Sequence, residues 1–197
     1  MRDNAEGQAA RTWCRSVGSA GENLDTEDEM ANGRELLGIY LNDHLAGAIV
    51  GRELSKRSAK SNQGTEFGPF LVKLSAEIEE DERSLRMIMD RLGVKPNPVK
   101  DSGAWLAEKF GRLKLNGSLT GYSELSRVVE LEGLTVGITG KLALWRSLKE
   151  SAATGGQSLD GQSLDGIDLD LLLARAEKQL SDVEERRVTA ARMAFSA

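Results

Sequence analysis

The chain has 197 residues, of which 40% are hydrophobic and 29% are charged, and its formal net charge is -5. This length and composition are typical of one globular domain. The negative charge and the lack of a basic stripe with interleaved aromatic residues argue against nucleic-acid binding. No run approaches the ~18 apolar residues of a membrane span, and the start of the chain lacks the apolar stretch of a signal peptide. Together with Cys14, the single cysteine, these features predict a soluble, cytoplasmic protein.

Residues 1–33 are polar and show no helical periodicity. We therefore expect them to form a disordered or loosely docked N-terminal tail. Residues 34–197 are predicted to form the folded domain, because four segments there carry apolar residues at helical spacing. These segments are 34–59, 67–92, 123–149 and 167–195.

The connections between these segments differ in length, and this predicts the topology. Residues 61–64 form a short break, so the first two helices should be antiparallel neighbours. The second connection is long, begins with Pro96 and Pro98, and contains a short amphipathic segment at 105–115. A long crossover between two helical hairpins is the ferritin-like arrangement. We therefore predict an all-α, ferritin-like four-helix bundle whose crossover carries a short extra helix, with a plain up-down bundle as the alternative.

Ionisable side chains fall on the apolar face of every predicted helix. They are His44, Glu77, Asp81, Glu132 and Arg187. An isolated charge in the core costs several kcal/mol of desolvation. These groups should therefore pair with one another, bind a metal ion or line a water-filled cleft, unless rotation of a helix moves some of them to the rim.

Two interpretations of this core set remain open. An oxygen-rich site built from Asp81, Glu132 and His44 would suit Mn²⁺ or Mg²⁺ better than iron. Alternatively, Arg187 and His44 balance Asp81 and Glu132 in a metal-free network, since one guanidinium can serve two carboxylates. Such a network would fix the register of the helices.

Glycines form a second pattern inside the predicted first and third helices. They are Gly47, Gly51, Gly133, Gly137 and Gly140. Each costs about 1 kcal/mol relative to alanine in a helix interior, so they should serve a purpose. Spaced by three or four residues, they form flat strips on which another helix can pack closely. The partner would be the other glycine-bearing helix of the same chain or a second copy in a homodimer.

Four segments carry a resemblance to a known superfamily. They are Tyr-Leu-Asn-Asp-His-Leu-Ala-Gly-Ala at 40–48, Glu-Ile-Glu-Glu-Asp-Glu at 77–82, Trp-Leu-Ala-Glu-Lys-Phe-Gly-Arg-Leu-Lys-Leu-Asn-Gly at 105–117 and Gly-Lys-Leu-Ala-Leu-Trp-Arg at 140–146. Over residues 34–195 the chain resembles the ferritin-like superfamily, closest to uncharacterised small bacterial four-helix proteins. The resemblance implies the fold and no activity. The superfamily's Glu-x-x-His di-iron ligands have no counterpart in this sequence, whose single histidine is His44.

The leading prediction is a metal-free ferritin-like bundle that acts as a structural or interaction module, with a homodimer as a candidate assembly and no cofactor. The alternative is a divalent-metal-binding protein or oxidoreductase that uses Mn, Mg or Fe at a carboxylate-rich site. A third class is a protein that binds a small ligand in the bundle core, between the first and third predicted helices.

Overall fold

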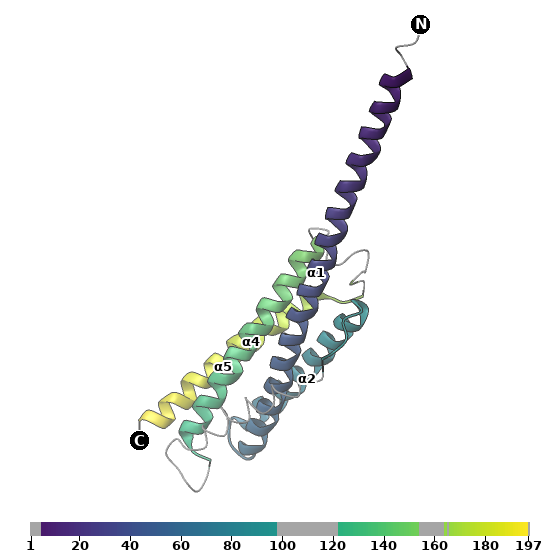
Figure 1. Ribbon diagram of the computed structural model, residues 1–197. Helices are drawn as coiled ribbons and strands as arrows, with labels where there is room; N and C mark the ends of the chain where they lie inside the picture. Colours follow the sequence, from purple (N-terminus) through teal and green to yellow (C-terminus); the bar gives the residue numbers. More distant parts are fainter. Residues whose placement is uncertain (1–4, 98–121, 154–163, 165, 197) are drawn as a thin grey trace.

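The computed structural model is all-helical within the residues that it describes (Figure 1). Its backbone is described for residues 5–97, 122–153, 164 and 166–196, and its side chains for the part of these ranges from residue 31 onward. Four helices lie in these ranges. They are α1 (Ala5–Ser61), α2 (Gly68–Arg91), α4 (Glu124–Ala153) and α5 (Leu169–Phe195). No helix in the described part of the chain has the length and apolar character needed to cross a bilayer.

The predicted helices at 67–92, 123–149 and 167–195 agree with α2, α4 and α5 to within a few residues. The first helix is longer than predicted, because α1 begins at Ala5. The side chains of residues 1–30 lie outside the described part, so the predicted docking or disorder of the 1–33 tail stays a prediction. The short helix expected at 105–115 also lies outside the described residues.

Local chemistry explains why the first hairpin turns where it does. After α1 ends, Asn62 Nδ2 donates to the Ser58 carbonyl at 2.8 Å, and Gly64 adopts a left-handed φ of +80°. At Gly68 a Cβ atom would lie 2.7 Å from the Asn62 carbonyl oxygen, so only glycine fits this approach. Pro69 then occupies the first turn of α2, where a missing N–H costs nothing.

Helix α2 ends at the glycine that the sequence predicts as its terminator. Gly93 has a φ of +65°, and its N–H donates to the Asp90 carbonyl at 3.0 Å. The Val94 N–H donates to the Met89 carbonyl at 2.8 Å, which completes a Schellman motif.

Contacts between helices fix their directions. Tyr40 Oη of α1 donates to Ser147 Oγ near the end of α4 at 3.3 Å, whereas Asn62 accepts from Arg127 at the start of α4. Helices α1 and α4 are therefore antiparallel neighbours. Helix α5 pairs with α4 in the same sense, because Lys149 contacts Asp170 and Glu132 contacts Arg187.

The apolar core consists of two clusters that lie one after the other along the helices. The first includes Leu41, Met89, Trp145 and Leu172, and the second includes Leu54, Phe67, Leu131 and Val183. Each cluster draws residues from all four helices. The stretch between them, at the level of Asp81, is where polar groups and an open cavity replace continuous apolar packing.

Candidate functional site

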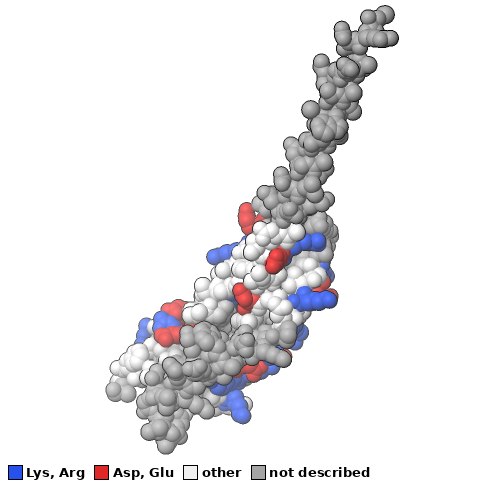
Figure 2. Space-filling view, viewed as in Figure 1, with Lys and Arg blue, Asp and Glu red and all other residues white. Residues whose placement is uncertain are grey.

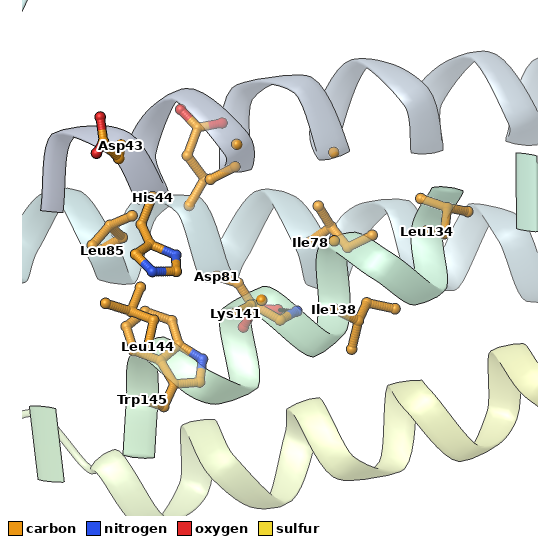
Figure 3. A pocket seen from close by; sticks show the side chains of 16 residues that line it. Asp43, His44, Ile78, Asp81, Leu85, Leu134, Ile138, Lys141, Leu144 and Trp145 are labelled. Carbon is orange, nitrogen blue, oxygen red and sulfur yellow. Dashed lines mark hydrogen bonds and ion pairs between the residues drawn. The ribbon is translucent and has the colours of Figure 1, made fainter. Parts of the chain in front are cut away.

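A cavity of about 180 Å³ lies between α1, α2 and α4, at the junction of the two core clusters. Figure 3 shows side chains from the three helices pointing toward this space. Most of the lining is apolar. The apolar lining residues include Ile78, Leu85, Leu134, Ile138 and Leu144. A space of this size is comparable to the engineered cavity of ~150 Å³ that binds benzene.

Glycines create this cavity. Gly47 and Gly51 of α1 face Gly137 and Gly140 of α4 across it, and a Cβ atom added to any of the four would meet no atom within 4 Å. The prediction that α1 and α4 pack closely is therefore wrong at these four glycines, and their alternative role as the seam of a homodimer stays a prediction. Larger residues of the flanking clusters, such as Trp145, hold the helices apart, so the absent side chains leave open volume.

Gly47 and Gly137 are exposed, so the cavity opens to solvent along the seam of α1 and α4. In Figure 2, uncharged surface lies between scattered charged side chains on this side.

Trp145 forms one end of the cavity and carries an unsatisfied donor. The residue is 1% exposed, and its indole Nε1 has no hydrogen-bond partner among the described residues. A buried N–H without an acceptor is unfavourable and rare in folded proteins. Because a helical side chain leans toward the N-terminus of its helix, the indole of Trp145 is directed back over the turn that contains Lys141 (Figure 3).

His44 lies on the α1 wall of the same cavity. Its imidazole packs edge-on against the Tyr40 ring, with the ring centroids 4.5 Å apart and the planes at 73°. Burial lowers the pKa of His44, and the nearby Asp43 carboxylate opposes that shift only in part. The imidazole therefore stays neutral near pH 7, and a neutral imidazole can both donate and accept a hydrogen bond.

A buried ion cluster closes the α2 side of the cavity. Asp81, whose side chain is 3% exposed, pairs with Lys141 of α4 and, at 2.6 Å, with Arg175 of α5. Gln179 of α5 donates to both Asp81, at 3.2 Å, and Glu77, at 3.1 Å. Lys141 also donates to the Gln179 carbonyl. The cluster thus connects α2, α4 and α5, three helices that must keep one register for these contacts to form.

Lys141 and Asp81 are the members of this cluster that line the cavity. Burial lowers the pKa of its ammonium group, while the facing Asp81 carboxylate raises it. The result is a pKa below the ordinary value for lysine. The ion pair with Asp81 offsets the free-energy cost of burying the Lys141 charge, because each of the two opposite charges stabilises the other.

The structure divides the predicted site residues between two places. His44 and Asp81 line the same cavity, and Glu77 joins Asp81 through Gln179. Glu132 and Arg187 lie elsewhere and face each other at 3.8 Å, with the Glu132 side chain 53% exposed. Arg187 pairs more closely, at 2.7 Å, with Glu184 on its own helix.

Rotation of α4 explains the position of Glu132. Val136, which lies one turn after Glu132 on the same side of the helix, is 73% exposed. The buried face instead passes through Leu131, Leu134 and Ile138, and therefore includes Lys141, one turn before Trp145. Lys141, Arg175 and Gln179 do not appear among the residues predicted from the sequence. Gln179 comes three residues after the buried Ala176 and four before the buried Val183, and this helical spacing could have predicted that Gln179 is buried.

A second polar cluster lies where α1 ends and α4 begins. Tyr122 Oη accepts from Asn62 Nδ2 at 2.7 Å and donates to Glu130 at 3.0 Å. Arg57 donates to the other oxygen of Glu130 at 3.0 Å. Burial and the Glu130 carboxylate raise the pKa of Tyr122 to about 12. These contacts fix the end of α1 against the start of α4.

The residues near the cavity are poorly suited to a metal ion. No group of three or more His, Cys, Asp or Glu side chains within the described ranges is arranged to hold one. Asp81, the most buried carboxylate of the predicted metal set, already faces Lys141 and Arg175. A cation placed there would have to displace one of these positive groups.

Comparisons with protein-family models, curated proteins and solved structures find no match to this chain. The cavity and the residues around it are therefore the features that point to a function.

Proposed function

We propose that the protein is a metal-free, ferritin-like four-helix bundle that acts as a binding module, and that its cavity takes a small, largely apolar molecule. The observation that carries the proposal is the cavity of about 180 Å³ bounded by four glycines. Alanine at those positions would stabilise the helices without a clash, so the glycines lower the stability of the fold. Their missing side chains are what leaves the cavity open. An apolar cavity that is lined by a few polar groups is typical of ligand-binding sites.

The surrounding polar groups support binding rather than catalysis. Lys141 and Asp81 neutralise each other, and Asp81 is further fixed by Arg175 and Gln179. Groups in such a network serve as a rigid wall for a ligand and hold the three helices in register. This combines the structural role predicted from the sequence with the ligand site predicted between the first and third helices.

The ferritin-like relationship is part of the proposal. Its support is the pairing of α1 with α2 and of α4 with α5, and the positions of the helix ends. The end of α2 lies near the start of α5, where a Cβ atom added to Gly166 would lie 3.7 Å from Arg91 Nη2, whereas α4 begins near Asn62. A crossover between these opposite ends would match the predicted long connection. A cytoplasmic location and a homodimer remain predictions, and light scattering of the purified protein tests the dimer.

The test of the proposed function is binding of ethylbenzene, a hydrocarbon probe that fits the cavity. We expect ethylbenzene to raise the midpoint of thermal unfolding in a concentration-dependent way, because it binds only the folded state. The variant Gly47→Ala/Gly137→Ala should lose this response, since two methyl groups enter the cavity. Gly38→Ala is the matched control, because it changes a glycine of α1 that does not line the cavity. No response in the wild type would contradict the proposal.

Metal analysis tests the alternative of a divalent-metal protein. Protein purified without chelators should contain no stoichiometric Mn, Mg or Fe. Stoichiometric metal that is lost in Asp81→Ala would favour the metal-binding alternative instead.

A further inference from the structure

The unsatisfied indole N–H of Trp145 identifies the chemistry that the cavity lacks. Indole nitrogen is a donor and never an acceptor, so its partner must supply a lone pair. Trp145 Nε1 is buried and has no partner among the described residues, although the residue lines the cavity. Two buried carboxylates line the cavity, and both are already paired. Asp81 contacts Lys141, Arg175 and Gln179, and Glu82 contacts Arg52 and Arg86.

We infer that the ligand of this cavity is a compact, largely apolar molecule with one uncharged hydrogen-bond acceptor, such as a ketone or aldehyde oxygen, that accepts from Trp145 Nε1. This inference rests on the proposed function and specifies its ligand. The apolar lining binds the body of the molecule, and the indole N–H orients its polar end. A buried donor that is satisfied only by the correct ligand discriminates against analogues that lack the acceptor.

The charges around the cavity favour an uncharged acceptor over an anion. Three carboxylates line the space, those of Asp43, Asp81 and Glu82. Lys141 is the cationic side chain of the lining, and its charge is directed at Asp81. Arg175 is paired with Asp81 as well, and Glu82 is paired with Arg52 and Arg86. An anionic ligand would therefore meet no unpaired positive charge among these groups in a desolvated site. A cation offers no lone pair to the indole N–H.

The rings and backbone around the cavity favour a flat molecule. Trp145 and His44 present aromatic rings from α4 and α1, and Figure 3 shows them on the same side of the cavity. The glycines of both helices present backbone without side chains. An aromatic ring with one small acceptor-bearing substituent matches this shape and the volume of about 180 Å³.

Two probes of nearly equal shape test the inference. Acetophenone carries a carbonyl oxygen, and α-methylstyrene has a methylene group in its place. Protein labelled with ¹⁵N at tryptophan shows one indole signal for each of its three tryptophans, and Trp145→Phe identifies the signal of Trp145. We expect acetophenone, and not α-methylstyrene, to move the Trp145 N–H signal downfield. The carbonyl stretch of bound acetophenone should move to lower frequency.

Affinities measured for both probes in both proteins isolate the hydrogen bond. The ratio of the two dissociation constants should change by about fivefold between wild type and Trp145→Phe, in the direction that disfavours acetophenone in the variant. Should Trp145→Phe fail to fold, the indole and carbonyl signals of the wild type decide the matter.

The outcomes separate this inference from the proposed function. Equal effects of both probes on the Trp145 signal, with an unchanged affinity ratio in the variant, would overturn the acceptor inference and leave the binding function in place. Absence of binding by both probes would overturn the proposed function and this inference with it.

Discussion

Lys141 of α4 donates a hydrogen bond to the Asp81 carboxylate of α2, at the level where the two apolar clusters of the core meet. Both side chains are largely removed from water, with 3% of Asp81 and 15% of Lys141 exposed. Arg175 adds a second positive charge from α5. The Asp81 carboxylate is therefore the shared partner of side chains from α4 and α5. Its removal would leave the buried Lys141 without this counter-ion, while Arg175 would keep its ion pair with Glu80 at 2.8 Å.

We predict that Asp81→Asn lowers the free energy of unfolding by about 3–5 kcal/mol, because it breaks a buried pair by removing one partner. Urea denaturation followed by circular dichroism measures this change. Glu132→Gln is the matched control, since Glu132 is an acidic residue on a helix whose pair with Arg187 is exposed. Its effect should stay below about 1 kcal/mol. Similar losses in both variants would show that burial of the Asp81 pair is not what stabilises the fold.

Asp81 and Glu132 show how much of the fold and of the site can be predicted from the sequence. Apolar periodicity predicts the positions of α2, α4 and α5, because a helix that buries one face must repeat its apolar residues at helical spacing. The rotation of α4 is harder to predict. Valine at 136 lies on the solvent side and Glu130 on the buried side, so apolar character there does not follow burial. Glu132 and Lys141 are nine residues apart, which places them about half a turn from each other round the helix, so the choice of buried face decides which of them reaches the site.

The cavity could be predicted only in part. Glycine spacing marks the two helices that face each other, but the same spacing suits close packing and open space equally well. Which of these occurs depends on the distance between α1 and α4, and that distance depends on side chains far away in sequence, including Trp145. The partners of Asp81 on α4 and α5 are likewise long-range contacts that local patterns do not specify.

The open space at the glycines leads to a prediction about stability. We expect Gly137→Ala to raise the free energy of unfolding by about 0.5–1 kcal/mol, because alanine reduces the backbone entropy of the unfolded chain and its methyl group meets no atom within 4 Å. Gly68→Ala should do the opposite, since its Cβ would lie 2.7 Å from the Asn62 carbonyl oxygen. Urea denaturation of both variants provides the comparison. Destabilisation by Gly137→Ala would show that α1 and α4 pack closely there after all.

His44 should make stability depend on pH in the acidic range. Burial lowers the pKa of His44 below its ordinary value of 6.5, with Asp43 opposing. Between the folded pKa and 6.5 the unfolded chain binds more protons, so stability rises with pH through this window. The stability that His44 gains by remaining neutral is fully present above pH 6.5 and is lost as the pH falls toward its folded pKa.

The titration of His44 can be followed directly, because it is the only histidine of the chain. Its imidazole proton resonances should report a midpoint below 6.5 by NMR. In His44→Gln the slope of stability against pH should become smaller in the same window, while Asp43→Asn should lower the His44 midpoint further. A midpoint at or above 6.5 would contradict the buried, neutral imidazole.

Tyr122 should produce the corresponding effect at alkaline pH. Burial first, and then the Glu130 carboxylate, raise the pKa of Tyr122 from 10.0 to about 12. Between these values the unfolded chain loses the phenolic proton while the folded protein keeps it. The stability that Tyr122 contributes is therefore fully present below pH 10 and declines as the pH rises toward 12.

Tyr122→Phe isolates this contribution. The variant loses the hydrogen bonds to Asn62 and Glu130, so it should be less stable than the wild type at neutral pH. The difference should narrow between pH 10 and 12, because the wild type loses its advantage as the pH rises. Tyrosinate absorbance of the wild type minus that of the variant gives the ionisation of Tyr122 itself, and Tyr40→Phe serves as the control. Ionisation of Tyr122 near pH 10 would mean that its hydroxyl is open to water and does not donate to Glu130, and the cluster that fixes α1 to α4 would then lack this bond.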